Sequence, residues 1–459
     1  MSTGNAEVVV IGAGPAGIAA ALELLPARSC HVTIVERGLD LPQRARVIED
    51  GGEGRASARL EGFGGAGAFS DGKLTLTVEV GGHLGEIVGA AAARQLVEAA
   101  DALWLAYGAP TEVHGAPDAT TDDLGRRAIM AGMKLATVPL RHVGTDRCPE
   151  VLARMRSALL AGCEVRFGTA AAQVLTQDGR VVGVVLADGT RLPADFVILA
   201  PGRSGQPWVQ EQAKTLGLQS DPSPVDLGVR VETPAAVLQE LTDALYEFKL
   251  LYWSPTFDNL VRTFCVCPYG EVVTERLGDV VTVNGHSYAR RRTQNSNFAL
   301  LVSSRFTRPF NDPVAYGQYI ARLANLLGDG VLVQRYTDLV AGRRTTPRRL
   351  EHCITTPTLP SAAPGDLSYV LPYRHLKAII EMLQAIDRLA PGVAGPGTLL
   401  YGIEVKLYSA RVSVSEELET DIGGLYACGD GAGITRGLIQ ATASGIACGR
   451  AIAARTCSA

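Results

Sequence analysis

The sequence opens with a strand, a glycine-rich turn and a helix in close succession. Residues 8–11 are apolar and mostly β-branched, the turn reads Gly12-Ala13-Gly14-Pro15-Ala16-Gly17, and the residues that follow are rich in Ala and Leu. β-branched residues favour strands, whereas Ala and Leu favour helices. The order predicts a dinucleotide-binding βαβ unit, in which Gly12 permits the tight turn, Gly14 lets a pyrophosphate approach and Gly17 lets helix and strand pack closely.

A second apolar run, residues 30–35, completes this unit and ends at Glu36, 22 residues after Gly14. We expect Glu36 to accept hydrogen bonds from the ribose hydroxyls of an adenosine group, and a carboxylate there disfavours a 2′-phosphate. The helix that follows, expected over residues 18–25, directs free N–H groups and a positive dipole end toward the pyrophosphate, next to Pro15 and Ala16 of the turn. The alternative is a glycine-rich turn in an ordinary α/β protein.

A second glycine-rich segment spans residues 62–74, downstream of Arg37. Glycine is too costly in entropy for this segment to form a stable helix or strand. We interpret it as a loop whose backbone lies along a ligand, with hydrogen bonds donated by two of its side chains. A flexible surface loop is the alternative, but it would expose apolar residues of the segment. The positions expected at the ligand are Arg37, Gly64, Gly65, Ser70 and Lys73.

A third glycine-rich segment lies near the end of the chain. A short strand runs into Gly429-Asp430, and a helix is predicted from about Thr435 to Ala454. Asp430 can accept from a ribityl hydroxyl, and the helix N-terminus near Gly437 and Leu438 can stabilise negative charge on a flavin. An ADP site at the start of the chain and a ribityl site at its end together favour FAD over NAD.

Two intermediate segments fit the same cofactor. A strand that follows the nucleotide-binding unit brings Ala171 beside the adenine, and the small-residue turn with Ala200 and Gly202 returns the chain past the cofactor. No second GxGxxG follows a strand, which argues against a separate nicotinamide domain. We therefore predict an α/β fold with a Rossmann-like FAD-binding domain of the glutathione-reductase type and no NAD domain.

The pattern of predicted strands, turns and helices changes along the chain and indicates two domains. Residues 1–225 and 392–459 are expected to form the FAD-binding domain, with a helical excursion at 84–133. In residues 226–391, β-rich runs alternate with turn residues, and two helices are also predicted. We expect this segment to form an inserted mixed α+β domain, a substrate or cap domain.

Net charge and apolar content indicate which partners and which compartment to expect. The net charge of −4 over 459 residues points to neither nucleic acid nor an anionic membrane. The sequence has no leader with a short apolar core and no run of about 18 apolar residues, so we expect a cytoplasmic protein.

The nine cysteines lack the spacing of a zinc site, so we expect reduced thiols and no metal. Cys428 and Cys448 lie in apolar contexts that are typical of small core residues. Cys265 and Cys267 would share one face of a strand and could form a redox pair near a flavin, although ordinary strand residues are the more conservative interpretation.

Candidate catalytic residues come from a late alternating run. Glu404, Lys406 and Tyr408 share one face of a predicted strand, and we expect them to line the flavin. A lysine near flavin N5 could position water or hold a substrate carboxylate, whereas a Lys406–Glu404 ion pair is an equally good interpretation. His286 and His142 are further candidates, with a structural hydrogen bond as the alternative for His142.

Two clusters of arginine stand out, at residues 290–292 and at Arg343, Arg344, Arg348 and Arg349. The conservative interpretation is a solvated rim. The alternative is a docking surface for an acidic partner such as a carrier protein.

Several motifs together resemble one protein family. They are Gly12 to Gly17, residues 63–73, 283–288 and 297–302, Pro309-Phe310-Asn311-Asp312-Pro313, and Gly429 to Gly449. The chain resembles the NAD(FAD)-utilising family of FAD-dependent dehydrogenases, and more distantly geranylgeranyl reductases and other flavoproteins with a single nucleotide-binding domain. The resemblance implies the fold and FAD, and it indicates little about the substrate.

These observations predict an FAD-dependent oxidoreductase, a dehydrogenase or oxidase that moves a hydride between a small organic substrate and flavin N5. One alternative is a tailoring enzyme whose substrate is tethered to an acidic carrier protein. Another is a non-redox role of FAD in an isomerase, a cyclase or an RNA-modifying protein, the last disfavoured by the net charge. The oligomeric state is left open.

Overall fold

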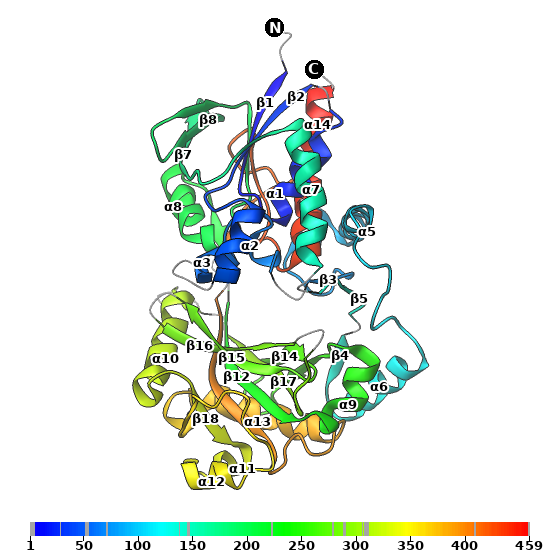
Figure 1. Cartoon of the computed structure of the whole chain (residues 1–459), viewed down its shortest axis with the longest axis vertical. Coiled ribbons are helices and arrows are strands. Elements are labelled where there is room, and N and C mark those ends of the chain that lie inside the picture. Colours follow the sequence, from blue (N-terminus) through cyan, green and yellow to red (C-terminus); the bar gives the residue numbers. More distant parts are fainter. Residues whose placement is uncertain are drawn as a thin grey trace. The chain divides into compact units, whose positions relative to one another are not determined.

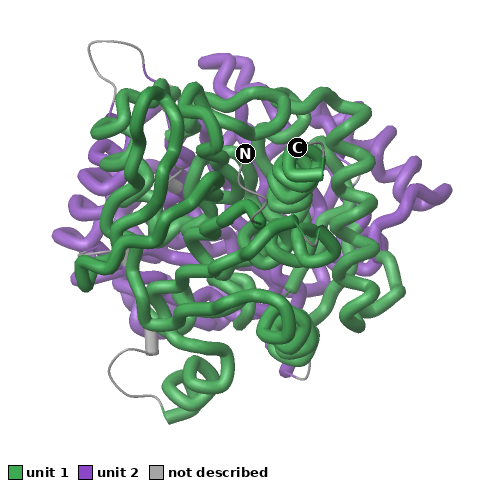
Figure 2. The backbone as a smooth tube through the Cα atoms, turned by 90° about the horizontal axis from the view of Figure 1, so that it is seen from above, with its two compact units in different colours: residues 1–113, 140–222, 409–459 green, residues 114–139, 223–408 purple. Residues whose placement is uncertain are grey.

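The computed structural model describes residues 5–27, 29–50, 55–69, 72–136, 138–144, 147–221, 224–277, 280–287, 291–304, 306, 312–407 and 410–457. The chain divides into two compact units, each built from separated segments of sequence (Figures 1 and 2). Unit 1 comprises residues 1–113, 140–222 and 409–459. Unit 2 comprises residues 114–139 and 223–408.

Unit 1 is organised around a parallel sheet, which has five strands among the described residues. Its order is β22-β10-β1-β2-β6, and every neighbouring pair is parallel. The strands are β1 (Ala6–Ile11), β2 (Cys30–Val35), β6 (Glu164–Arg166), β10 (Phe196–Leu199) and β22 (Leu425–Ala427). The three central strands end in buried apolar residues because helices cover this sheet, as is usual for parallel sheets.

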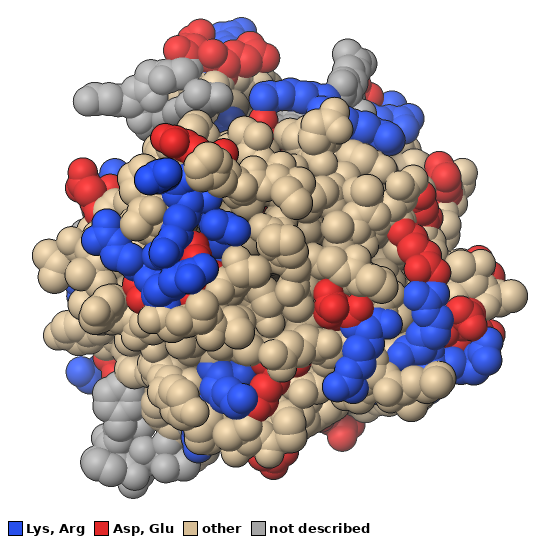
Figure 3. Space-filling view, turned by 90° about the horizontal axis from the view of Figure 1, so that it is seen from below, with Lys and Arg blue, Asp and Glu red and all other residues tan. Residues whose placement is uncertain are grey.

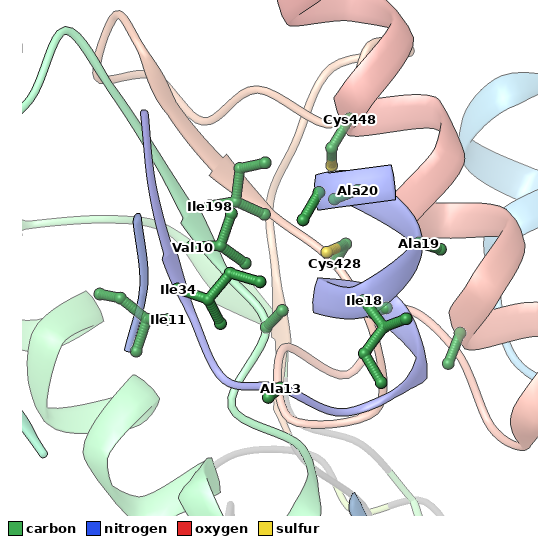
Figure 4. Packing of buried hydrophobic residues seen from close by; sticks show 14 of the residues in the cluster. Val10, Ile11, Ala13, Ile18, Ala19, Ala20, Ile34, Ile198, Cys428 and Cys448 are labelled. Atoms are coloured by element: carbon green, nitrogen blue, oxygen red, sulfur yellow. The ribbon is translucent and has the colours of Figure 1, made fainter. Parts of the chain in front are cut away.

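Two helices from opposite ends of the chain pack tightly together in unit 1. They are α1 (Pro15–Leu24) and α14 (Leu438–Cys457). A Cβ at Gly445 of α14 would lie 2.0 Å from the carbonyl oxygen of Ala16, so the approach depends on the missing side chain. Figure 4 shows Val10 and Ile198 of the sheet in the core that these helices share. Cys428 and Cys448 lie fully buried in this core, which confirms their predicted structural role.

The remaining elements of unit 1 surround this core. Its helices include α2 (Leu41–Asp50), α3 (Arg55–Leu60), α4 (Leu84–Val88), α5 (Ala90–Ala106), α7 (Cys148–Gly162) and α8 (Gln206–Leu216). Three smaller sheets are made by β3 (Lys73–Thr75) with β5 (Leu140–His142), by β7 (Ala171–Gln177) with β8 (Arg180–Leu186) and β9 (Arg191–Pro193), and by β11 (Ser220–Asp221) with β21 (Arg411–Val412).

Unit 2 is built on a mixed sheet, for which eight strands are described. In spatial order they are β19 (Ala363–Pro364), β18 (Leu332–Arg335), β20 (Leu399–Leu407), β12 (Val225–Pro234), β17 (Asn295–Ser304), β14 (Leu260–Cys267), β13 (Lys249–Trp253) and β4 (Lys134–Ala136). A separate hairpin is formed by β15 (Glu271–Leu277) and β16 (Val280–His286). The helices of this unit are α6 (Ala119–Met130), α9 (Ala235–Leu245), α10 (Pro313–Gly328), α11 (Tyr336–Val340), α12 (Pro347–Glu351) and α13 (Tyr373–Asp387).

The unit boundaries differ from the expected ones at two places. Residues 114–139, all expected in the first domain and up to residue 133 in its helical excursion, lie in unit 2 because β4 pairs with β13 and Arg127 donates to the carbonyl oxygen of Leu389. Residues 392–408, expected in the FAD-binding domain, also lie in unit 2 because β20 pairs with β12 and β18. Long-range strand pairing places both segments in unit 2, and such pairing cannot be predicted from the local sequence.

Helix α14 begins three residues later than the predicted start at Thr435. The backbone of residues 434–436 is engaged elsewhere, because Arg436 N donates to Gly81 O and His83 N donates to Ile434 O. Gly437, with φ of +102°, then turns the chain into the helix.

Candidate functional site

The turn after β1 has the close packing that its glycines predict. A Cβ at Gly17 would lie 1.9 Å from the carbonyl oxygen of Gly12, and a Cβ at Gly12 would lie 2.3 Å from the carbonyl oxygen of Ala200. Gly12 also has φ of +106°, a conformation that other residues rarely adopt. The strand, the turn and the start of α1 therefore approach one another as a dinucleotide-binding unit requires.

The N-terminus of α1 is open in front of this turn. Gly14 is the N-cap, Pro15 is the first helical residue, and no side chain among the described residues caps the helix. A Cβ at Gly14 would meet only the Cα of Gly65, at 4.0 Å. The uncapped N–H groups of the first turn and the space above Gly14 fit a pyrophosphate.

Glu36 is fixed at the end of β2, beside the turn. Its carboxylate accepts hydrogen bonds from the backbone N–H of Ala13 and of Gly38, each over 2.8 Å, and the residue is 7% exposed. Each carboxylate oxygen keeps a further acceptor position. The position therefore remains suited to ribose hydroxyls, with the carboxylate already oriented by the backbone.

The second glycine-rich segment lies directly against the first. Gly64 N donates to Ala13 O over 2.8 Å, and a Cβ at Gly65 would lie 3.3 Å from the Cα of Gly14. At its far side, a Cβ at Gly67 would lie 2.1 Å from a methyl carbon of Leu438, the first residue of α14. This loop thus runs from the start of α1 to the start of α14, as a backbone that follows a bound ligand would.

Arg44 holds this loop in place, a role that the sequence did not reveal. Its guanidinium is fully buried and donates to the carbonyl oxygens of Ala58, Phe63 and Gly65. Burial lowers the pKa of Arg44 to about 10, although Glu36 and Glu61 act in the opposite direction. Because its partners are backbone carbonyls, no pattern of residue types marks the position.

The third glycine-rich segment forms the other end of the site. Asp430 accepts from Thr435 Oγ1 over 3.0 Å and from Gly437 N over 3.4 Å. Burial raises the pKa of Asp430, partly offset by Arg203. A Cβ at Gly431 would lie 2.3 Å from the carbonyl oxygen of Gly202, so this turn packs against the small-residue turn after β10.

Further predicted cofactor residues lie around the same turns. Arg37 pairs with Glu61 and donates to Ser204 O over 3.1 Å. Ala171 begins β7, two residues after Thr169, whose N–H donates to the carbonyl oxygen of Glu36. Ser70 lies outside the described residues.

Two candidates from distant parts of the sequence are brought together in unit 1. Lys73 of β3 is the direct cross-strand neighbour of His142 of β5. Both side chains are half-buried. Their pairing was not predicted, because nothing in either segment specifies the partner strand.

In unit 2, Lys406 and Glu404 form the ion pair that was weighed as the alternative to a catalytic role. Lys406 Nζ lies 3.0 Å from Glu404 Oε1, and Glu404 is fully buried between Lys406 and Arg230. Burial lowers the pKa of Lys406, but Glu404 and Glu275 overcome this effect and leave the pKa raised. Lys406 is therefore a cation at neutral pH.

The remaining catalytic candidates of unit 2 are His286 and Tyr408. His286 is exposed at the end of β16, opposite Glu271 in the ladder. Tyr408 lies outside the described residues. Arg230, which sequence reasoning missed, is fully buried and contacts Glu404 at 3.4 Å.

Comparison with known proteins shows which family this chain belongs to. Residues 224–407 match the family model described as "FAD-dependent protein, C-terminal domain-like". An "Uncharacterized protein" of Clostridium beijerinckii (strain ATCC 51743 / NCIMB 8052) is 30% identical over 477 residues, which cover 96% of this chain and 80% of the relative. The chain belongs to this family of FAD-dependent proteins. Its cofactor is FAD, and the residues of unit 1 fit that cofactor, since Gly14 leaves space at an uncapped helix and Glu36 is a fixed acceptor.

Solved structures resemble this FAD-dependent protein only distantly. A probable FAD-dependent monooxygenase from Pseudomonas aeruginosa, pqsL, is 14% identical with a TM-score of 0.37, over 98% of this chain and 86% of pqsL. Glycine oxidase from Bacillus cereus ATCC 14579 is 13% identical with a TM-score of 0.38, over 98% and 97% of the two chains.

The described residues contain no group of three or more His, Cys, Asp or Glu side chains able to hold a metal ion. No helix within the same ranges is long and apolar enough to cross a membrane.

Proposed function

We propose that this flavoprotein is an oxidoreductase that transfers hydride between a small organic substrate and flavin N5. The observation that supports it is the convergence, within unit 1, of three glycine-rich segments on the start of α1 and the start of α14. Unit 1 is proposed to be a Rossmann-like domain of the glutathione-reductase type without a separate NAD domain, and unit 2 to be an inserted substrate domain. The distant likeness to geranylgeranyl reductases belongs to the same proposal.

Each residue of the site has a proposed part in holding the cofactor. The N–H groups at the start of α1 bind the pyrophosphate, Glu36 binds the adenosine ribose, and Asp430 accepts from the ribityl chain. When bound, FAD supplies the two-electron chemistry. The start of α14 orients its positive dipole end toward the charge that develops on reduction.

We assign Lys406 a binding role toward the substrate. Its raised pKa makes it a poor general base at neutral pH, because a base must first lose its proton. A cation that Glu404 holds in position is suited to a substrate carboxylate. Glu404, which is fully buried, acts through Lys406 as a positioning residue.

Anaerobic rapid mixing tests the proposal. The purified protein is mixed separately with NADH, NADPH and fractions of small metabolites, while the oxidised-flavin band near ~450 nm is followed. Bleaching by a metabolite fraction supports a dehydrogenase or oxidase and leads to its substrate. Bleaching by NADH or NADPH alone supports a reductase or monooxygenase.

A flavin that none of these reagents reduces would contradict hydride transfer and favour a non-redox role. Replacement of FAD by its oxidised 5-deaza analogue, without reductant, separates that case, since a non-redox activity would persist. The Gly14→Ala variant is the control, because it is expected to lose FAD while the fold remains.

One feature of unit 2 favours a second candidate, a tailoring enzyme for substrates tethered to an acidic carrier protein. Arg335, Arg343 and Arg349 surround the single buried carboxylate of Asp338, at 3.9, 2.8 and 3.8 Å. These guanidinium groups and Arg344 therefore carry more positive charge than Asp338 neutralises. Figure 3 shows how Lys and Arg side chains gather into groups on one face.

The other arginine cluster has local partners. Arg291 pairs with Glu271, and Arg292 stacks over the ring of Tyr269 at 4.8 Å. Arg290 lies outside the described residues. This cluster fits a solvated rim better than a docking surface.

Charge reversal tests the docking candidate. Arg343→Glu combined with Arg344→Glu should abolish salt-sensitive binding of an acyl carrier protein without loss of FAD. The matched control is Arg126→Glu with Lys134→Glu, two exposed positions elsewhere in unit 2. Equal binding of the carrier by both variants would exclude this surface.

A further inference from the structure

A buried guanidinium contacts a thiol inside unit 2. Arg230 of β12 is fully buried and donates through Nε to Asn297 Oδ1 over 2.7 Å. Its Nη2 donates to the carbonyl oxygen of Cys265 over 2.7 Å and to the sulfur of Cys267 over 3.1 Å. A cation in hydrogen-bond contact with a sulfur atom favours the thiolate over the thiol.

Charged groups of both signs lie around these thiols. Two cations, Arg230 and Lys406, share the fully buried carboxylate of Glu404. A second carboxylate, Glu275, whose side chain is 33% exposed, lies 3.8 Å from Lys406. The two carboxylates balance the two cations, so it is the direct contact of Arg230 Nη2 with the Cys267 sulfur that favours a negative charge on that sulfur.

Both thiols belong to this electrostatic group. Burial lowers the pKa of Arg230, but Glu404 and then the two cysteines reverse that effect and raise it. Cys265 also raises the pKa of Lys406, after Glu404 and Glu275. The cysteines thus lie close enough to these cations to interact with them.

The backbone at the two cysteines departs from regular strand geometry. Cys265 has φ of +45°, and the pairing of β14 with β17 shifts register between Phe264 and Cys267. Few residues other than glycine adopt such a conformation. Cys265 is half-buried, Cys267 is buried, and neither is in a disulfide.

The β15–β16 hairpin covers the guanidinium of Arg230. This close approach explains why position 285, within one of the motifs that carry the family resemblance, is a glycine. A Cβ at Gly285 would lie 1.9 Å from Arg230 Nη2 and 2.2 Å from Asn297 Oδ1. Cys265 is partly exposed and Cys267 is buried, so solvent reaches the pair more readily at Cys265.

We propose that Cys265 and Cys267 are a redox-active dithiol that exchanges with small-molecule disulfides. The Cys265 thiolate attacks one sulfur of the small disulfide and releases its other half as a thiol, leaving a mixed disulfide. Cys267, held as a thiolate by Arg230, then attacks the Cys265 sulfur and releases the second half as a thiol. The protein gives up two electrons and each released thiolate takes a proton from water, so that one small disulfide becomes two thiols.

A redox titration of the full FAD-loaded chain tests this. The protein is equilibrated without oxygen in buffers of rising oxidised-to-reduced glutathione ratio, quenched in acid, alkylated and mapped by mass spectrometry. The expected result is conversion of the Cys265–Cys267 peptide from its doubly alkylated form to an internal disulfide. Cys163 is the matched control, since it is also half-buried and burial raises its pKa to about 11.

Single variants resolve the order of steps. Cys267→Ser should stop at a mixed disulfide of glutathione on Cys265, and Cys265→Ser should slow modification of Cys267 at least about tenfold, because the accessible sulfur is lost. Three results overturn the proposal: both thiols stay alkylatable throughout the titration, the wild type retains a stable mixed disulfide, or Cys163 is modified at the same ratio as Cys265.

Discussion

The carboxylate of Glu36 accepts a hydrogen bond from the backbone N–H of Ala13, over 2.8 Å. The acid that ends β2 is thereby joined to the glycine turn that ends β1, and its second oxygen accepts from Gly38 N. Orientation of this carboxylate and conformation of the turn are therefore coupled. In the proposed site, both hold the groups that would bind the adenosine ribose and the pyrophosphate.

Glu36→Gln should weaken FAD binding and lower stability. An amide offers an NH₂ group to one of the two backbone N–H donors, so one buried hydrogen bond is lost at a cost of about 1–3 kcal/mol. Flavin content per chain and thermal unfolding measure the two effects. Glu7→Gln on β1 is the control, because Glu7 is exposed and pairs only with His31 among the contacts described. Retention of full FAD affinity would show that Glu36 does not hold the cofactor.

Gly14→Ala and Gly17→Ala should separate binding from folding. Gly14 has an extended backbone with φ of −80°, and its Cβ would meet nothing closer than 4.0 Å, so Gly14→Ala should fold but lose FAD. Gly17→Ala would place a Cβ 1.9 Å from a carbonyl oxygen and should destabilise the fold by several kcal/mol, on the order of the cost of overpacking. Circular dichroism melts and flavin absorbance distinguish them. A yellow Gly14→Ala protein would mean that the pyrophosphate lies elsewhere.

Arg44→Met should loosen the second glycine-rich segment. The change removes the side-chain donor to the carbonyl oxygens of Ala58, Phe63 and Gly65, of which Gly65 O still accepts from Ala68 N, and it costs about 3 kcal/mol of unfolding free energy. FAD affinity should fall with it, since that segment lies against Gly14. Urea unfolding and fluorescence titration with FAD measure both quantities. The exposed Arg46 gives the control Arg46→Met, for which no change is expected.

The features that the sequence predicted are those encoded locally. The places of Gly17, Glu36 and Asp430 in the fold could be predicted because a strand, a turn and a helix in fixed order already determine where such residues lie, while their roles toward the cofactor stay predictions. The partners of Arg44 and Arg230 could not, because backbone carbonyls and a thiol brought in by distant strands leave no spacing to detect.

The misplaced domain boundaries have the same cause. Residues 134–136 come directly after the expected helical excursion, yet they form the edge strand β4 because residues 249–251 of β13 pair with them. Strand pairing across more than a hundred residues depends on the completed sheet and not on local propensity.

Stability should fall as the pH drops from about 6.5 to 4, because of His375. Burial, with a smaller effect of Arg374, lowers the pKa of His375 to about 4, and its Nε2 lies 2.9 Å from Ser304 Oγ. In this range the unfolded chain binds a proton that the folded chain does not, so protonation favours unfolding, by about 3 kcal/mol over the whole interval. Urea unfolding at several pH values measures the slope. His375→Gln should flatten it, and an unchanged slope in that variant would assign the effect to other groups.

Variants of Glu404 and Lys406 should distinguish an ion pair from a residue that serves the reaction. Glu404→Gln leaves Arg230 and Lys406 without their shared carboxylate in the interior, at a cost of about 3–5 kcal/mol. Lys406→Met leaves the Arg230–Glu404 pair intact and should cost much less. The double variant should be more stable than the sum of the single effects predicts, because one of the two stranded cations is gone. Additivity within about 0.5 kcal/mol in urea unfolding would refute the coupling.

Flavin reduction in Lys406→Met tests whether Lys406 serves the reaction. If the variant keeps its stability and its FAD, but the metabolite fraction that reduces the wild-type flavin no longer reduces the variant's, Lys406 serves the reaction. If reduction is unchanged, the role of Lys406 is limited to the ion pair.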